Sequence, residues 1–377
     1  MTATRKGLSI AFFGSSLLSA YWNGAATYYR GIIRALHARG HRVRFFEPAT
    51  VDRQGHRDLE VPPWADVVDY PAASGCTDGV EHALTAARDA DVIIKGSGVG
   101  VFDELLERAI PDFARQGTAC VYWDVDAPLT LERMRADPED PLRGQLPRYD
   151  LVLTRGGGDP VVRAYRGFGA RRCVPIYNAV DPDVHRPAPA DARFEATLAF
   201  LGNRVPDREH RVDEFFLKPA RCLPEQRFLL GGSGWDDLEL PENVSYSGHV
   251  YARDHNAFNC SPLAVLNVSR EPMARWGHSP APRVFEAAGA GACLISDAWT
   301  GIERLLAPER EILVANDGAE VAEQVRALDP RRAQAIGRAA RARVCAEHTY
   351  ERRALEVEAE LGVRMDARER VTPIMEQ

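Results

Sequence analysis

Short apolar runs alternate with helical stretches from one end of the chain to the other, and this alternation limits the possible fold more than any other feature. Such alternation is typical of parallel α/β sheets, in which each helix carries the chain from one strand to the next. The expected strands of the first half lie at 8–15, 41–48, 91–97, 118–126, 150–156 and 172–178. Those of the second half lie at 196–203, 227–232, 243–250, 262–269, 292–297 and 311–317.

A chain of 377 residues is too long for one ordinary core, so two domains are expected. The proline-containing stretch 177–194 separates the two runs of strands and suits an extended connector. We therefore expect an N-terminal Rossmann-like domain at 1–180 and a C-terminal one at 181–350. The predicted fold class is α/β, with two facing Rossmann-like domains and an interdomain cleft in which ligands bind beyond the strand ends.

The last part of the chain reads as helix after Pro330, with a break near His348 and Thr349. Residues 351–377 are expected to return to the N-terminal domain. Domains that face each other across a cleft usually close on their substrate, so we also expect motion about residues 177–189.

Composition excludes several classes of protein. The net charge of −7 argues against a nucleic-acid partner, which would require a basic face. No apolar run approaches the roughly 20 residues that span a bilayer, so no membrane span is expected. The seven cysteines are scattered and form no Cys-x-x-Cys pair, which supports neither a disulfide framework nor a zinc site. A reduced cytoplasm is the expected location.

A glycine-containing loop follows the first expected strand. Gly14 and Ser15 close that strand, and Gly24 precedes a helix, where bare backbone amides could approach an anionic ligand. A tight strand-to-helix connection without a ligand would account for the loop equally well. The Gly-x-Gly-x-x-Gly fingerprint of dinucleotide-binding proteins is absent from this loop.

The corresponding loop of the second half carries arginines. Gly202 turns the chain, Arg204 and Arg208 flank the start of a helix, and Asp207 is a candidate N-cap. The planar guanidinium group pairs two oxygens at once, so these arginines could hold a diphosphate. A solvated charged face is the alternative.

The stretch 267–297 joins several of these signals. A polar loop with Arg270, Glu271 and His278 leads to a helix that begins near Pro282. Arg283 and Glu286 are three residues apart and therefore share one face of that helix. A carboxylate here can accept two neighbouring hydroxyls, as a ribose offers, and the arginine can meet a phosphate. An ordinary surface pair is the alternative.

At these residues the chain resembles the GT-B glycosyltransferases, and most closely their CgeB-like (spore maturation protein-like) branch. The resemblance covers nearly the whole chain and is most specific in "RVFEAAGAGACLISD". The other matching stretches are "FFGSSLLSAYWNGAATYYRGIIRALHARGH", "LAFLGNRVPDRE", "SGHV" and "LNVSRE".

The resemblance implies a nucleotide-sugar donor, most often a UDP-sugar, bound by the second domain without a metal or another cofactor. It implies that Glu286 holds the ribose and that Arg208 and Arg283 meet the phosphates. His278 stands where many relatives carry a glutamate that contacts the donor sugar. The remaining residues implied to bind the donor are His249 and Val250 at the nucleobase, Arg270 and Glu271 in the polar loop, and Gly14, Ser15 and Gly24 across the cleft.

Asp124 and Asp126 follow an apolar strand of the first half. Either one could take the proton from an acceptor hydroxyl, which makes both candidate catalytic bases. Asp-x-Asp after a strand is also a metal-binding signature of a different glycosyltransferase architecture. We favour the acceptor side over a metal because the second half already supplies a nucleotide site. A helix cap, or acceptor binding without proton transfer, would also account for the two carboxylates.

These observations together predict a glycosyltransferase that moves a sugar, such as a hexose, from a nucleotide-diphosphate donor to an unidentified small-molecule or polymer acceptor. A monomer or homodimer is expected. Two alternatives share the fold: a sugar-nucleotide epimerase, which turns over without an acceptor, and a non-catalytic morphogenetic binding protein.

Overall fold

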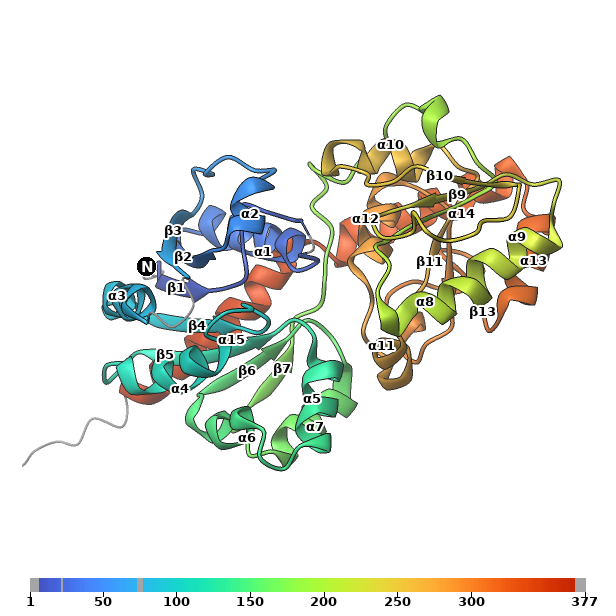
Figure 1. Ribbon diagram of the computed structural model, residues 1–377. Helices are drawn as coiled ribbons and strands as arrows, with labels where there is room; N and C mark the ends of the chain where they lie inside the picture. The colour runs from blue at the N-terminus through green and yellow to red at the C-terminus, as the bar shows by residue number, and fades with distance from the viewer. Residues whose placement is uncertain (1–6, 22, 73–76, 370–377) are drawn as a thin grey trace, which may run out of the picture. The chain divides into compact units, whose positions relative to one another are not determined.

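The computed structural model describes residues 7–21, 23–72 and 77–369, with side chains described as far as 362. It divides the chain into two compact units, which are shown in Figure 1. Unit 1 contains Met1–Tyr177 and Tyr350–Gln377, and unit 2 contains Asn178–Thr349. The boundaries predicted from the sequence, after residues 180 and 350, lie within a few residues of these two divisions.

Unit 1 is built on a seven-stranded sheet in the described part of the chain, with the strand order β3-β2-β1-β4-β5-β6-β7. All neighbouring strands are parallel, and Ile10 of β1 pairs with Val43 of β2 on one side and Val92 of β4 on the other. The strands are β1 Ser9–Phe13, β2 Arg42–Ala49, β3 Asp66–Pro71, β4 Val92–Gly96, β5 Ala119–Asp124, β6 Leu151–Thr154 and β7 Cys173–Pro175.

Helix α1 shows how the sequence pattern produces this unit. Its apolar side chains recur at helical spacing, so that Tyr28, Ile32 and Leu36 lie on one buried face. The helices of unit 1 are α1 Ala26–Ala38, α2 Val51–Gly55, α3 Asp78–Ala87, α4 Asp103–Phe113, α5 Ala127–Ala136, α6 Pro141–Gln145, α7 Gly158–Gly167 and α15 Tyr350–Glu369.

Helix α15 comes from the C-terminal end of the chain but packs beside α1 in unit 1, as the red and blue ribbons of Figure 1 show. The Tyr350 ring packs so closely on Gly31 that a Cβ atom there would lie 2.3 Å from Tyr350 Cε2. Farther along α15, Glu358 accepts hydrogen bonds from Arg39 at 2.8 Å and contacts His41 Nε2 at 2.8 Å. The break expected near His348 is confirmed, because the preceding helix ends at Glu347.

Unit 2 contains a parallel six-stranded sheet among the described residues, in the order β10-β9-β8-β11-β12-β13. Its central strands are almost continuously apolar and buried, as parallel strands covered on both faces require. The strands are β8 Leu198–Leu201, β9 Phe228–Gly231, β10 Val244–Tyr246, β11 Ala264–Asn267, β12 Leu294–Asp297 and β13 Leu313–Ala315.

Helices of unit 2 connect these strands, and two separate apolar clusters pack against the sheet. A short π-helical segment, Asp213–Leu217, joins α8 to α9. The α-helices are α8 Pro206–Val212, α9 Lys218–Cys222, α10 His255–Cys260, α11 Glu271–Trp276, α12 Pro282–Ala290, α13 Gly318–Ala327 and α14 Pro330–Glu347.

Each strand expected from the sequence is present, but β3 was not predicted. This strand lies at the edge of its sheet, and Tyr70 is its one buried residue. An edge strand with exposed side chains lacks the continuous apolar run that marks the inner strands.

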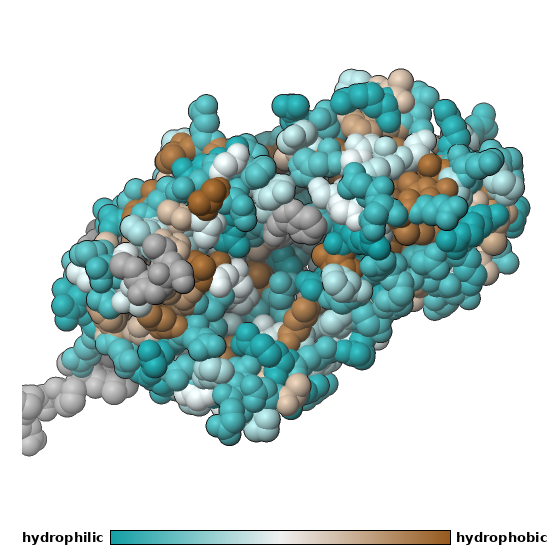
Figure 2. Space-filling view, in the orientation of Figure 1, coloured by the Kyte–Doolittle hydropathy of each residue, from teal (hydrophilic) through white to brown (hydrophobic). Residues whose placement is uncertain are grey.

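The molecular face in Figure 2 is mainly hydrophilic, with hydrophobic residues in small separate patches. Within the described residues, no helix combines the length and the apolar character that crossing a bilayer requires.

Candidate functional site

Both sheets have a point at which the direction of strand addition reverses, between β1 and β4 in unit 1 and between β8 and β11 in unit 2. Ligands of open α/β sheets bind beyond the carboxyl ends of the strands at such a switch point. In unit 2 the chain leaves β8 towards Arg208 on α8, and it leaves β11 towards Arg270 at the start of α11. These loops therefore form the candidate ligand site of unit 2.

Arg208 and Arg283 lie on the same aromatic ring at this point. The Cζ atom of Arg208 is 5.6 Å from the centroid of the Phe200 ring, and that of Arg283 is 5.0 Å from it. Phe200 belongs to β8 and is fully buried. The aromatic face attracts both guanidinium groups, although their charges repel each other.

Neither guanidinium group has all of its buried N–H donors satisfied. Among the described residues, Arg208 Nε and Arg283 Nη1 are buried without a hydrogen-bond partner. Burial lowers the pKa of Arg208 to about 9, and repulsion from Arg283 and Arg270 adds to the shift. Burial likewise lowers the pKa of Arg283 to about 10. Unsatisfied buried N–H donors on two neighbouring positive charges cost stability. A bound anion would accept hydrogen bonds from these donors and would also neutralise the positive charge.

The neighbouring arginine, Arg270, is paired with a carboxylate. Its Nε lies 3.0 and 2.8 Å from the two oxygens of Asp207, and its Nη2 lies 2.7 Å from Asp207 Oδ2. The prediction that Asp207 caps α8 is wrong, because Val205 occupies the N-cap and Asp207 lies inside the helix. Its carboxylate binds a tertiary partner instead of the backbone of its own helix.

Arg211 links three residues beneath the same loops through hydrogen bonds. It donates to Asp297 at 2.6 Å, to Glu271 at 3.1 Å and to the carbonyl oxygen of Ser269 at 3.0 Å. Asp297 is fully buried at the end of β12 and also accepts from the backbone N–H of Ser269 at 3.1 Å. Glu271 and Asp297 therefore hold the protein's own loops together.

Glu286 is half-buried on α12, one turn after Arg283. In the described part of the chain, its side chain forms no hydrogen bond or ion pair. Its negative charge favours the charged form of Arg283 without neutralising it through a direct contact. The carboxylate thus remains able to accept hydrogen bonds from a ligand.

His278 lies in the loop before α12 with an unusual backbone conformation. Its φ of 48° is in the left-handed region, and it follows Gly277, whose φ is 69°. The backbone N–H donates to the carbonyl oxygen of Thr300 at 2.6 Å. The imidazole packs on Gly301, where a Cβ atom would lie 2.0 Å from His278 Nδ1. Strained backbone of this kind concentrates at functional sites.

His249 and Val250 follow β10 and differ in exposure. His249 is exposed, and its ring meets the Tyr251 ring edge-on with centroids 4.7 Å apart. The Val250 side chain is buried in the core, and its carbonyl oxygen lies 3.2 Å from His255 Nε2. Burial lowers the pKa of His255, so its imidazole is neutral at pH 7.

In unit 1, the first glycine loop is packed into the protein. A Cβ atom at Gly14 would lie 2.4 Å from the Phe45 ring, so the glycine is needed for packing. Ser15 is buried and donates to Asn23 at 3.0 Å. Gly24 is exposed, and a Cβ atom added there would meet nothing within 4 Å.

The structure separates Asp124 from Asp126. Asp124 is fully buried and accepts from Ser97 Oγ at 2.7 Å and from the Tyr165 hydroxyl. Asp126 keeps 43% of its side chain exposed and lies 3.3 Å from Nη2 of Arg155. The two hydrogen bonds that Asp124 accepts hold this loop in place. Asp126 remains accessible to a substrate.

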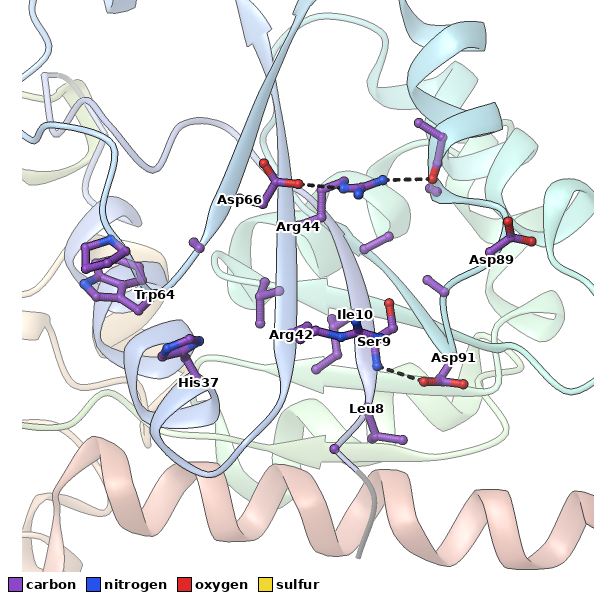
Figure 3. A pocket seen from close by; sticks show the side chains of 18 residues that line it. Leu8, Ser9, Ile10, His37, Arg42, Arg44, Trp64, Asp66, Asp89 and Asp91 are labelled. Atoms are coloured by element: carbon purple, nitrogen blue, oxygen red, sulfur yellow. Dashed lines mark hydrogen bonds and ion pairs between the residues drawn. The ribbon is translucent and has the colours of Figure 1, made fainter.

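A hollow of about 930 Å³ lies at the amino ends of the unit 1 strands, opposite the carboxyl ends, where Asp124 and Asp126 lie. Figure 3 shows Arg44 bonded to Asp66, and Asp91 bonded to the backbone of Ser9. These residues stand at the amino ends of the strands, away from the edge at which α/β sheets bind ligands. No cluster of three potential metal ligands occurs among His, Cys, Asp and Glu side chains of the described residues.

The structure thus brings Arg208, Arg270, Glu271, Arg283 and Glu286 to one edge of the unit 2 sheet. Sequence reasoning missed Phe200, Arg211 and Arg155. Arg211 could have been found, because it lies three residues after Arg208 and shares its helix face. Phe200 is an ordinary apolar strand residue in the sequence, and its contact with two arginines depends on tertiary packing.

Comparison with known proteins places these observations in a family context. A family model described as glycosyl transferase-like matches residues 208–359. A comparison with curated proteins gave no match.

Solved structures resemble nearly the whole chain. The Anabaena protein HepE, solved with UDP and glucose, has a TM-score of 0.67 and 16% identity, over 94% of this chain and all of that one. Sucrose-phosphate synthase from Thermosynechococcus elongatus has a TM-score of 0.67 and 16% identity, over 96% of this chain and 99% of that one. An α-glucosyltransferase solved with UDP-glucose and DNA has a TM-score of 0.70 and 12% identity, over 94% and 100%.

These similarities confirm the predicted fold class, with two Rossmann-like α/β domains. The matched family model covers the part of unit 2 that carries Arg208, Arg283 and Glu286. Residues 208–359 therefore match a glycosyl transferase-like family model, and nearly the full length of the chain shares the fold of these solved structures.

Proposed function

We propose that the protein transfers a sugar from a nucleotide-diphosphate donor, a UDP-sugar, to the hydroxyl of an acceptor. The observation that carries this proposal is the pair of buried guanidinium groups of Arg208 and Arg283 with unsatisfied N–H donors. A diphosphate offers anionic oxygens that match these donors. HepE and the α-glucosyltransferase, which share the fold, were solved with UDP or UDP-glucose.

Each residue at the switch point has a role in this proposal. Arg208 and Arg283 bind the diphosphate and stabilise the negative charge that grows on it as the bond to the sugar breaks. Glu286 accepts hydrogen bonds from the ribose hydroxyls. Arg270, His249 and Val250 line the neighbouring loops, and His278 faces the donor sugar. Two cationic side chains supply the charge that a metal ion provides in other transferases, so we propose a metal-independent reaction.

Asp126 is the proposed base in unit 1. The acceptor oxygen attacks the anomeric carbon, the bond from that carbon to the diphosphate oxygen breaks, and the acceptor proton passes to the Asp126 carboxylate. Asp126 suits this role because it is accessible, whereas both oxygens of Asp124 accept internal hydrogen bonds.

We further propose that the protein is a CgeB-like enzyme that acts in the cytoplasm as a monomer or homodimer. Its motif "RVFEAAGAGACLISD" and its scattered cysteines support these assignments. The acceptor is a small molecule or polymer with a free hydroxyl.

Calorimetric titration with UDP, TDP, GDP and ADP tests the proposal, and we expect UDP to bind best. Glu286→Ala should weaken UDP binding about tenfold, because a charged hydrogen-bond acceptor contributes about 1.5–3 kcal/mol. Glu356→Ala, at an exposed α15 carboxylate paired with Arg353, is the control. Absence of binding by every nucleotide would refute the proposal. Product analysis by NMR with the donor alone would reveal an epimerase instead.

A further inference from the structure

Helix α12, which carries Arg283 and Glu286, contacts both segments through which the chain passes between its two units. The first passage lies between Tyr177 and Asn178, and the second between Thr349 and Tyr350. Every contact used below lies within unit 2. These contacts connect the proposed donor site to the two places where the units are joined.

The first contact fixes the start of the helix. Asn178 is 1% exposed, and its Nδ2 donates to the carbonyl oxygen of Pro280 over 3.1 Å. Pro280 lies two residues before Pro282, the first residue of α12. Both prolines have restricted backbone torsions, so a bond to Pro280 constrains the position of the first helical turn, which includes Arg283.

The second contact lies at the middle of the helix. Phe285 is fully buried, and its ring meets the imidazole of His348 edge-on, with centroids 5.8 Å apart and planes at 62°. Phe285 immediately precedes Glu286 in the chain. His348 is 8% exposed and stands directly before Thr349.

The third contact is with the backbone of the helix. A Cβ atom at Gly289 would lie 2.4 Å from Val180 Cγ2 and 3.1 Å from His185 Cβ. The helix therefore rests directly on the segment that follows Asn178, and no larger residue than glycine fits between them.

The two passage segments are also bonded to each other. Val180 donates its backbone N–H to the carbonyl oxygen of His348 over 2.8 Å, and Val180 and Thr349 form an isolated parallel bridge. The helix consequently packs on a small two-stranded element, and a shift of either strand is transmitted to the helix because packed interiors deform little.

We propose that Asn178 and His348 are positioning residues for the donor: one from each passage, they fix α12 and thereby place Arg283 and Glu286. This inference rests on the proposed function, because it takes these two side chains as the donor ligands. Donor binding at α12 and ordering of the two passage segments are then coupled. By linkage, each must favour the other by the same free energy.

Asn178→Ala tests the inference, with Asn243→Ala as its matched control. Asn243 is another asparagine of unit 2, and its Nδ2 donates to the carbonyl oxygens of Ala220, Leu223 and Gln226 at 3.0, 2.9 and 2.9 Å, away from α12. Both variants lose hydrogen bonds and stability. We expect Asn178→Ala alone to raise the Kd for UDP, by about tenfold, when both are measured well below their melting temperatures.

Hydrogen exchange of the wild-type protein gives a second readout that needs no variant. UDP should slow exchange in peptides covering 178–181 and 346–349 as well as in α12. Protection confined to the loops around Arg208 and Arg270, or equal Kd values for Asn178→Ala and wild type, would overturn the inference and leave the proposed function intact. Absence of UDP binding by the wild-type protein would overturn the proposed function itself, and this inference with it.

Discussion

The guanidinium carbon of Arg283 lies 5.0 Å from the centre of the Phe200 ring, and no hydrogen bond satisfies its buried Nη1 within the described residues. The guanidinium group of Arg208 also lies over the Phe200 ring, so two cations contact one aromatic side chain. Such an arrangement costs stability in the free protein. The cost is understandable when an anionic ligand completes the site.

Arg283→Met should therefore change stability and binding in opposite directions. The pKa of Arg283 is lowered to about 10, so below that pH its charged form is less favourable in the folded than in the unfolded chain. An apolar side chain of similar length removes this cost, and we expect an unchanged or higher melting temperature. The Kd for UDP should rise about tenfold or more, because a charge-assisted bond is lost.

Differential scanning fluorimetry and calorimetric titration measure both quantities. Arg338→Met is the control, since Arg338 is an exposed arginine of α14 whose replacement should change neither quantity. A destabilised Arg283→Met variant with unaltered UDP affinity would show that the arginine is structural.

Asp124→Asn and Asp126→Asn should have different effects, although the residues are two positions apart. Asn at 124 turns an acceptor into a donor that faces Tyr165 or Ser97, so we expect a loss of about 1–3 kcal/mol in unfolding free energy. Asn at 126 should leave stability within about 0.5 kcal/mol but reduce the transfer rate by about 10²–10⁴-fold. Chemical denaturation and UDP release from UDP-glucose during transfer measure the two effects. Full transfer activity in Asp126→Asn would exclude it as the base.

Glu358→Gln should loosen the attachment of α15 in a pH-dependent manner. The hydrogen bonds from Arg39, followed by that from His41, lower the pKa of Glu358 below its ordinary value. The ionised carboxylate therefore stabilises the fold above the unfolded pKa of about 4.3, and this contribution is lost as pH falls through the lower folded value.

At pH 7 we expect Glu358→Gln to lose about 1–2 kcal/mol. The difference in melting temperature from wild type should shrink as the pH is lowered below about 4. Glu347→Gln removes a more exposed pair with Arg343 on α14 and should have a small effect at every pH. A pH-independent deficit in Glu358→Gln would rule out this ion pair as its source.

Gly31→Ala should destabilise unit 1 through overpacking. The added Cβ would meet the buried Tyr350 ring at 2.3 Å, which we expect to cost about 1–3 kcal/mol. Gly167→Ala is the matched control, because nothing lies within 4 Å of the added atom at that helical glycine. Equal unfolding free energies in urea for the two variants would contradict the tight contact between α1 and α15.

The sequence was sufficient to locate the inner strands because inner parallel strands are continuous apolar runs. It was insufficient for β3, an edge strand whose side chains are largely exposed. Local rules also suggested that Asp207 caps its helix, whereas the partner that it binds, Arg270, is 63 residues away.

For the candidate site, the shared face of Arg283 and Glu286 followed from helical spacing alone. The residues that surround Arg283 and Glu286 could not be predicted in this way, because Phe200 and Asn178 contact this region through tertiary packing. The sequence does not distinguish Asp124 from Asp126. The tertiary structure does, because it buries Asp124 and leaves Asp126 accessible.

The return of α15 to unit 1 fixes the order in which the protein can mature during translation. Unit 2 is one uninterrupted stretch of chain and can assemble as soon as it has left the ribosome. Unit 1 emerges first, but the face of α1 around Gly31 and Tyr28 stays uncovered until Tyr350 has been synthesised. The half of the molecule that is made first is therefore finished last.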